Sequence, residues 1–188
     1  MVSSSGETYE KADFSGKRFE KGEYEDCLFH SCDLSNSLLN GSVFLDCRFV
    51  DCNLSLVSIS QTAFRNVRFE NCKMLGIQFQ NCNPLGLELR FSQCRLDNSS
   101  FAGLKLKKTM FENCGLQEVD FTSADLSESQ FEACDFRDAR FERTNLSKAD
   151  LRNSLNLQLQ PEENTLRGAR FSLQDLPGLL LHHGIRLD

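Results

Sequence analysis

The sequence has no tryptophan, only 3 prolines and 2 tyrosines, and no long apolar run. A membrane-spanning helix needs about 18 or more consecutive apolar residues, so a transmembrane protein is excluded. The opening stretch, MVSSSGETYEKADF, contains no basic segment followed by an apolar one, so a secretory signal peptide is not expected. These absences predict a cytoplasmic protein that makes no contact with a membrane.

Side chains that commonly perform catalysis are scarce as well. The histidines are His30 and the adjacent pair His182 and His183, and no nucleophile accompanies them in a recognisable motif. Two neighbouring histidines do not complete a zinc site, which needs three or four protein ligands. A glycine-rich phosphate loop is also missing. We therefore expect no enzyme activity, no metal and no cofactor.

Phenylalanine is abundant, with 16 residues, and large apolar residues return at every fifth position. One uninterrupted series of such anchors runs from Phe14 to Phe79, and a second runs from Phe91 to Leu151. Pro84 occupies the slot after the first series, and the register then slips by two residues at about 85–90. Most residues two positions before an anchor are small.

A period of five fits neither of the common regular structures. On an α-helix the anchors would rotate around the axis, and on a strand they would alternate between the two faces. A chain that turns a corner every five residues instead keeps every anchor on the inside. Four such sides close a coil of twenty residues, and stacked coils form a parallel β-solenoid.

The 9 cysteines test the twenty-residue coil independently, because each lies two residues before an anchor slot. Six of them form two series with a spacing of twenty residues and an interval of 22 between the series: Cys32, Cys52, Cys72, Cys94, Cys114 and Cys134. We expect all nine to point inward. Stacked strands lie about 4.8 Å apart, which is wide for a disulfide, and no CxxC pair indicates zinc. The thiols are interpreted as small buried hydrophobes.

The segments ADFSG (12–16), ADLSE (124–128), TNLSK (144–148) and ADLRN (149–153) resemble the A-(D/N)-L-x-x unit of pentapeptide-repeat proteins. The resemblance implies an all-β fold, a right-handed quadrilateral parallel β-helix over residues 12–155, preceded by a lead-in at 1–11. One interior column is predicted to run through the register slip: Phe29, Phe49, Phe69, Phe91, Phe111 and Phe131.

A narrower resemblance rests on CNLSLVSISQTAF (52–64), CKMLGIQFQNCNP (72–84) and the ending LQPEENTLRGARFSLQDLPGLLLHHGIRL. These are similar to the topoisomerase-protecting branch, the Qnr quinolone-resistance proteins and the albicidin and microcin immunity proteins. The resemblance implies a homodimer that mimics duplex DNA and binds DNA gyrase or topoisomerase IV, without binding nucleic acid itself. The repeat lacks the extended loops of enterobacterial Qnr proteins, which help those proteins to protect gyrase from quinolones. The resemblance therefore does not decide which gyrase poison is involved. A structural scaffold with an unrelated protein partner is the alternative.

The acidic residues that could stand in for phosphates cluster late in the repeat. Residues 109–136 hold seven acids and no Lys or Arg, in a chain of net charge -6. The predicted partner-binding set is Glu112, Glu118, Asp120, Asp125, Glu128, Glu132, Asp135 and Asp138. Asp120, Asp125 and Asp135 precede anchors, where Asp also serves the turn. A merely soluble acidic surface is the other interpretation, and Lys105, Lys107 and Lys108 are interpreted as a solvated patch.

The last segment, 156–188, is predicted to cap the solenoid and to mediate dimerisation. FSLQDLPGLLLHHG reads as a short helix that stops at Gly184, followed by a final strand at 185–187. The predicted dimer contacts are Leu173, Leu176, Leu179, Leu180 and Ile185.

Overall fold

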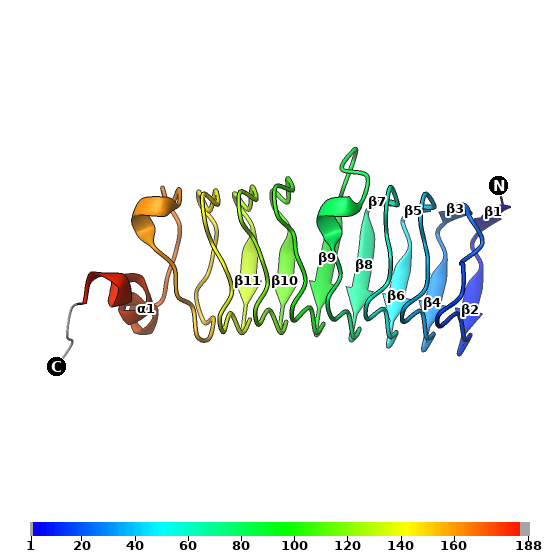
Figure 1. Cartoon of the computed structure of the whole chain (residues 1–188), viewed down its shortest axis with the longest axis horizontal. Coiled ribbons are helices and arrows are strands. Elements are labelled where there is room, and N and C mark those ends of the chain that lie inside the picture. Colours follow the sequence, from blue (N-terminus) through cyan, green and yellow to red (C-terminus); the bar gives the residue numbers. More distant parts are fainter. Residues whose placement is uncertain (1, 185–188) are drawn as a thin grey trace.

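In the computed structural model, which describes residues 2–184, the chain winds into a rod of stacked coils (Figure 1). One parallel sheet has the order β1-β3-β5-β7 and a second has the order β11-β10-β9-β8-β6-β4-β2. The first contains β1 (Val2–Ser5), β3 (Gly22–Glu25), β5 (Val43–Leu45) and β7 (Ala63–Arg65). The second contains β2 (Thr8–Glu10), β4 (Leu28–His30), β6 (Arg48–Val50), β8 (Val67–Glu70), β9 (Leu89–Ser92), β10 (Met110–Glu112) and β11 (Gln130–Glu132). The predicted all-β parallel solenoid is confirmed.

The other two sides of each coil are joined by isolated parallel bridges with an offset of twenty residues, or of twenty-two across the slip. Asp33 pairs with Asn53 on one of these sides, and Ser100 pairs with Asp120 on the other. The backbone N–H of Phe101 donates to the carbonyl of Asp120 at 2.8 Å, so each coil is bonded to the next all the way round. The predicted period of twenty residues is therefore the repeat of the structure.

The ladder is longer than the expected repeat of 12–155. β1 and β2 pair with β3 and β4, so the first residues described already form a coil. At the other end, Asn145 pairs with Thr165 and Asp150 pairs with Arg170. Within residues 2–184 no helix is long and apolar enough to cross a membrane.

The register slip is confined to one corner. Ala63 pairs with Asn83, twenty residues on, whereas Val67 pairs with Leu89, twenty-two residues on. The two extra residues project as a loop between β8 and β9 (Figure 1). Pro84 holds an anchor slot in the sequence, but the structure leaves it exposed, because the chain turns outward there. Leu87 packs against the core.

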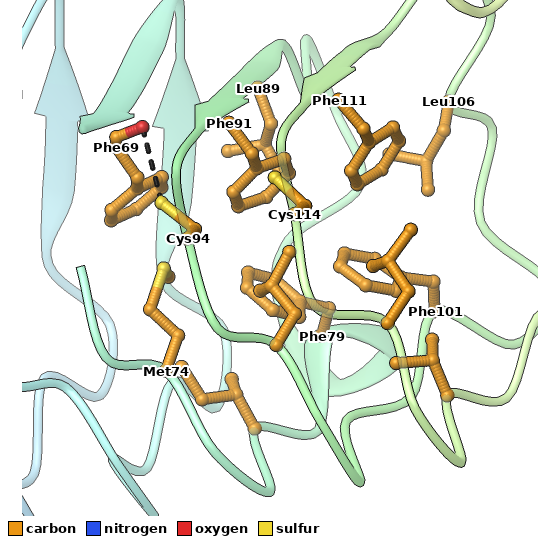
Figure 2. Packing of buried hydrophobic residues seen from close by; sticks show 14 of the residues in the cluster. Phe69, Met74, Phe79, Leu89, Phe91, Cys94, Phe101, Leu106, Phe111 and Cys114 are labelled. Carbon is orange, nitrogen blue, oxygen red and sulfur yellow. Dashed lines mark hydrogen bonds between the residues drawn. The ribbon is translucent and has the colours of Figure 1, made fainter. Parts of the chain in front are cut away.

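The predicted interior column is confirmed and begins one coil earlier, at Tyr9. Adjacent rings stack nearly parallel, with centroids 4.7 Å apart for Tyr9 and Phe29 and 4.9 Å apart for Phe111 and Phe131. Across the slip, the rings of Phe69 and Phe91 lie 5.4 Å apart and nearly parallel. Figure 2 shows three rings of this column side by side, with a second stack beneath them. Offset aromatic stacking adds to the burial of apolar area.

Ring size is exchanged between two neighbouring sides at the slip. One side carries Tyr24, Phe44 and Phe64 before the slip and Leu106, Leu126 and Leu146 after it. The next side carries Phe19, Leu39 and Ile59, changes to phenylalanine at Phe79 just before the slip, and continues with Phe101, Phe121 and Phe141 after it. The two changes offset each other, so the interior is filled to a similar volume along the rod, as close packing requires.

All nine cysteines are buried and free, as predicted, and most of them do more than fill space. The Cys94 thiol donates to the carbonyl oxygen of Phe69, one coil earlier, at 3.3 Å (Figure 2). Ser129 and Thr144 occupy equivalent positions, and their hydroxyls donate to anchor carbonyls at 2.8 Å. The position two before an anchor is therefore a donor position, which a small apolar residue would leave unused.

The C-terminal segment is tied to the last coil by its polar groups. Helical segments near this end are η2 (Pro161–Glu163), η3 (Leu173–Asp175), α1 (Leu176–Leu180) and η4 (Leu181–His183), while η1 (Phe79–Asn81) lies within the solenoid. The Ser172 hydroxyl accepts the N–H of Asn153 at 2.9 Å, and the Asp175 carboxylate accepts the N–H of Ser172 at 2.8 Å. The predicted short cap is therefore present.

Helix α1 lies close to the preceding chain. A methyl group at Gly178 would overlap the carbonyl oxygen of Leu157, so only glycine fits at this contact. The helical segment ends at Gly184, whose φ of 63° is left-handed, as the sequence predicts. The final strand predicted at 185–187 lies outside the described residues.

Replacing Phe111 with Ala should lower the free energy of unfolding by about 3–5 kcal/mol, because the ring is fully buried between two others. Chemical denaturation followed by circular dichroism measures this. Met110→Ala, one residue away on the exposed side, is the matched control and should change stability by about 0.5 kcal/mol or less. Equal effects of the two substitutions would contradict the inward column.

None of the nine thiols should react with Ellman's reagent in the native protein at about pH 8, whereas all nine should react after denaturation. Burial raises the pKa of Cys47 to about 12 and that of Cys82 to about 11, so the reactive thiolate of these two residues is not formed at that pH, and all nine thiols are shielded from the reagent by the coils around them. A thiol that reacts rapidly while the circular-dichroism spectrum is native would show that the column is open to solvent.

Candidate interaction surface

The outward side chains flank each anchor or stand at a corner. The corner residue, two positions after the anchor, has a left-handed backbone along most of the rod; Glu118 has a φ of 55° and Glu128 a φ of 61°. This conformation favours Gly, Asn and Asp. Acidic residues at corners are therefore held in place by the fold and project at an edge between two sides.

The eight predicted acids do not form one patch. Glu112 and Glu132 are neighbours in register on β10 and β11. Glu118, Asp120 and Asp138 line one shallow hollow together with Arg140. Asp125, Glu128 and Asp135 belong to neither group, and Asp125 and Glu128 both lie near Lys107. The structure thus brings the predicted acids together in small sets and not in one patch.

Three of the acids are engaged in turns, as expected. Asp120 accepts the N–H of Thr122 at 2.9 Å, and Asp125 accepts that of Ser127 at 3.0 Å. Asp135 does the same for Arg137 at 3.1 Å.

The carboxylate of Asp135 is held further by two amide side chains. Burial opposes its ionisation, but hydrogen bonds from Asn156 and Gln117 outweigh that effect and keep the pKa below its usual value. The carboxylate oxygens of Asp135 are therefore used by hydrogen bonds within the chain and are less available to a partner.

Glu128 is neutralised by its own chain. Its carboxylate lies 2.9 Å from the Lys107 ammonium and 3.8 Å from that of Lys108. The hydrogen bond from Lys107 lowers the pKa of Glu128, and the same bond raises the pKa of Lys107. Two of the three lysines in the predicted solvated patch thus pair with an acid of the predicted partner-binding set. Sequence spacing of about one coil could have indicated this contact.

Glu112 and Glu132 are the exposed acids that stack most directly. Their strands are in register, and neither glutamate forms an ion pair among residues 2–184. Glu112 accepts only the hydroxyl of Ser92, at 3.2 Å. Like charges opposite each other on paired strands repel, so this arrangement costs stability.

Charge also varies along the axis in a way that the sequence analysis missed. Residues 48–108 contain nine bases and four acids, whereas residues 109–138 contain eight acids and one base. Arg48, Arg68 and Arg90 form a column on β6, β8 and β9, next to the strands that carry Glu112 and Glu132. A count of charge by coil would have found this basic band.

The predicted dimer contacts fall into three groups. Leu173 is 86% exposed and Leu176 is 44% exposed, and Leu181, outside the predicted set, is 53% exposed. Leu179 is buried within the chain and Leu180 is half-buried. Ile185 lies outside the described residues.

The histidines do not gather into a metal site. His30 lies 3.3 Å from Asp51 and 3.8 Å from Glu10, and His183 lies 3.0 Å from Glu162. In the part of the chain that the structure describes, no cluster of three or more His, Cys, Asp or Glu side chains could hold a metal ion.

Known proteins share this architecture. A family model described as a pentapeptide repeat region matches residues 22–89 and 78–151. A search of curated proteins gave no significant match. A trypsin-treated variant of QnrB1, described as a plasmid-mediated fluoroquinolone resistance protein, is 19% identical with a TM-score of 0.64, covering 100% of this chain and 98% of that chain.

A second solved structure is similar over most of its length. HetL, a pentapeptide repeat protein involved in heterocyst differentiation regulation in the cyanobacterium Nostoc sp., is 13% identical with a TM-score of 0.60. The match covers 90% of this chain and 84% of that one. At these identities the likeness concerns the fold, a right-handed β-helix. The family model covers more than half of the sequence, and this chain belongs to the pentapeptide-repeat family.

Proposed function

We propose that this chain is a non-catalytic partner of a type II topoisomerase, DNA gyrase or topoisomerase IV, and that it modulates the response of the enzyme to a poison such as a fluoroquinolone or albicidin. The observation that carries the proposal is the pair Glu112 and Glu132, exposed and stacked in register on adjacent coils. A stack of like charges is unfavourable for the isolated protein, which favours a role in binding a basic surface.

Residues 109–138, the acidic band, have the charge density that mimicry of DNA requires. Residues 109–138 span about one and a half coils, or roughly 7 Å of the axis at about 4.8 Å per coil. Duplex DNA carries about one negative charge per 1.7 Å. The eight acids of this band reach that density even after Glu128 is discounted. Their spread around the rod is compatible with mimicry, since a duplex also carries phosphates all round its axis.

The fold supports the same proposal. A solenoid of equal extent is found in a trypsin-treated variant of QnrB1, a plasmid-mediated fluoroquinolone resistance protein. Phe, Leu and Cys side chains fill the interior, which favours binding at the surface over catalysis in a cavity. The protruding loop between Pro84 and Leu89 is short, which leaves the nature of the poison to experiment.

A second candidate is a solenoid scaffold with an unrelated protein partner. The likeness to HetL favours it, because that protein has the same fold and is described by a role in differentiation. The two candidates differ in one measurable way, since only the first predicts an effect on topoisomerase activity.

The double variant Glu112→Lys/Glu132→Lys should abolish the effect of the protein on gyrase supercoiling, measured with and without a fluoroquinolone or albicidin. The change removes the proposed contacts with the basic DNA-binding surface, and the parent association should weaken as salt is added. The melting temperature should stay within a few degrees, since exposed substitutions change stability by about 0.5 kcal/mol or less.

Glu23→Lys/Glu25→Lys on β3 is the matched control, because it reverses two exposed charges on another side of the rod. It should leave the effect on gyrase in place. A folded Glu112→Lys/Glu132→Lys protein that acts on supercoiling as the parent does would exclude this pair as the mimic, and a parent without any effect would favour the scaffold.

We also propose that the chain forms a dimer through its C-terminal cap, where Leu173 and Leu181 are exposed. The variant Leu173→Glu/Leu181→Glu should be monomeric in multi-angle light scattering at micromolar concentration, because charge is introduced into an apolar contact. Leu85→Glu, at an exposed leucine in the loop after Pro84, should leave the dimer intact. A parent protein that is itself monomeric would refute the dimer.

A further inference from the structure

The seven-stranded sheet presents a flat side on which charge changes sign halfway. Arg68 and Arg90 lie on β8 and β9, and Glu112 and Glu132 lie on the next two strands, β10 and β11. All four side chains are exposed. Four successive strands therefore carry two positive charges followed by two negative ones.

The arginines of this side are poorly compensated within their own chain. Arg48 donates two hydrogen bonds to Glu70, at 3.2 and 3.3 Å, so these two charges neutralise each other. Arg90 approaches only Glu88, at 3.6 Å, and among residues 2–184 Arg68 forms no ion pair. Arg68 and Arg90 are neighbours in register, so they repel each other as Glu112 and Glu132 do.

Apolar surface is also present at the change of sign. A surface hollow lies across β8, β9 and β10, lined by Arg68, Arg90, Met110 and Glu112 among others. The Met110 side chain is 41% exposed. A flexible methionine between opposite charges is typical of a surface that adapts to a partner.

We propose that a second copy of this chain docks on the seven-stranded side, antiparallel to the first. A two-fold axis along the strands, midway between β9 and β10, places β9 over β10 of the partner and β8 over β11. Arg90 then faces Glu112 of the other copy and Arg68 faces Glu132, and symmetry makes each contact twice. Both rods have the same coil spacing, so all four ion pairs are in register along the rod axis.

The geometry within each pair is diagonal. Each arginine precedes its ring residue and each glutamate follows its own, so their Cα atoms are offset by about 7 Å along the strand, a span that long side chains bridge. Glu70 is already neutralised by Arg48 and so does not oppose the contact strongly. Two parallel rods would instead place β8 over β8 and β11 over β11, so Arg68 and Arg90 of one copy would lie at the same level along the rod as those of the other and would not meet Glu132 and Glu112.

The association should be weak and sensitive to salt. The four strands β8 to β11 of each copy overlap, and at about 4.8 Å per strand and three or four residues each they give a contact of roughly 200–250 Å² per copy, which is below the usual size of a specific interface. Ion pairs on such a small, solvent-exposed surface are screened by salt. Self-association would cover Glu112 and Glu132, so it would compete with the proposed topoisomerase contact, but it does not depend on that function.

Sedimentation velocity at about 20 mM and about 500 mM salt tests the proposal, in the Leu173→Glu/Leu181→Glu background so that the cap does not contribute. The added variants Arg68→Glu/Arg90→Glu and Glu112→Arg/Glu132→Arg should each weaken low-salt association at least about tenfold. The quadruple variant that exchanges the four charges should restore it, as should an equimolar mixture of the two double variants. Glu23→Arg/Glu25→Arg, on another side, should have no effect.

Spin labels separate the antiparallel arrangement from unspecific attraction. A label at Ser92→Cys should give an intermolecular distance of about 10 Å, whereas one at Glu10→Cys should give about 40 Å, because β2 lies far from the axis. Two short distances would indicate parallel rods. Parallel rods would overturn the proposal. So would association that Arg68→Glu/Arg90→Glu leaves unchanged, or failure of both the quadruple variant and the mixture to associate.

Discussion

The whole molecule depends on one constraint: a coil must close after four sides so that each inward side chain lands on its counterpart in the coil before. Closure sets the backbone hydrogen bonds, since the N–H of Asp120 can reach the carbonyl of Ser99 only if the register is kept. It also sets the ring stack, in which Phe91 meets Phe69 despite two extra residues between them. The extra residues are pushed outward at a corner because the interior has no room for them. Side-chain size is exchanged between neighbouring sides at the same place.

This constraint explains which features could be predicted from sequence. Each side of a coil points only its anchor and the residue two before it into the interior, so the residue types at these positions must repeat from coil to coil. The columns of Phe and Cys were therefore visible in the sequence as periods of five and twenty. Outward positions obey no such rule. The exposure of Pro84 and the coil formed by β1 and β2 depend on local geometry that periodicity does not encode. The hydrogen bonds of the thiols were missed because cysteine was treated as apolar, although serine and threonine share its positions.

The same fold limits which acids can recognise a partner. An Asp before an anchor is drawn into the turn, as Asp120 and Asp125 are, and its oxygens are then partly used by backbone N–H groups. Glu128 is neutralised by lysines of the preceding coil. Composition alone therefore overstates the acidic surface. The acids that retain most of their capacity for binding are those that follow an anchor, such as Glu112 and Glu132, because the turn does not engage them and, among the described residues, neither forms an ion pair, although Arg152 lies near Glu132.

A solenoid also turns any repeated surface charge into a column, and each column of like charge costs a few tenths of a kcal/mol or more per neighbouring pair. The aromatic core tolerates that cost, since burial of one ring contributes several times as much. Two such columns of opposite sign meet on one flat side of this rod, between Arg90 and Glu112. Either column alone would attract many partners of opposite charge. Their order along the axis makes the surface directional, because a partner must present the reverse order to match both. An antiparallel copy of the same chain does so by symmetry, whereas a duplex-binding groove, basic throughout, would match only the acidic half.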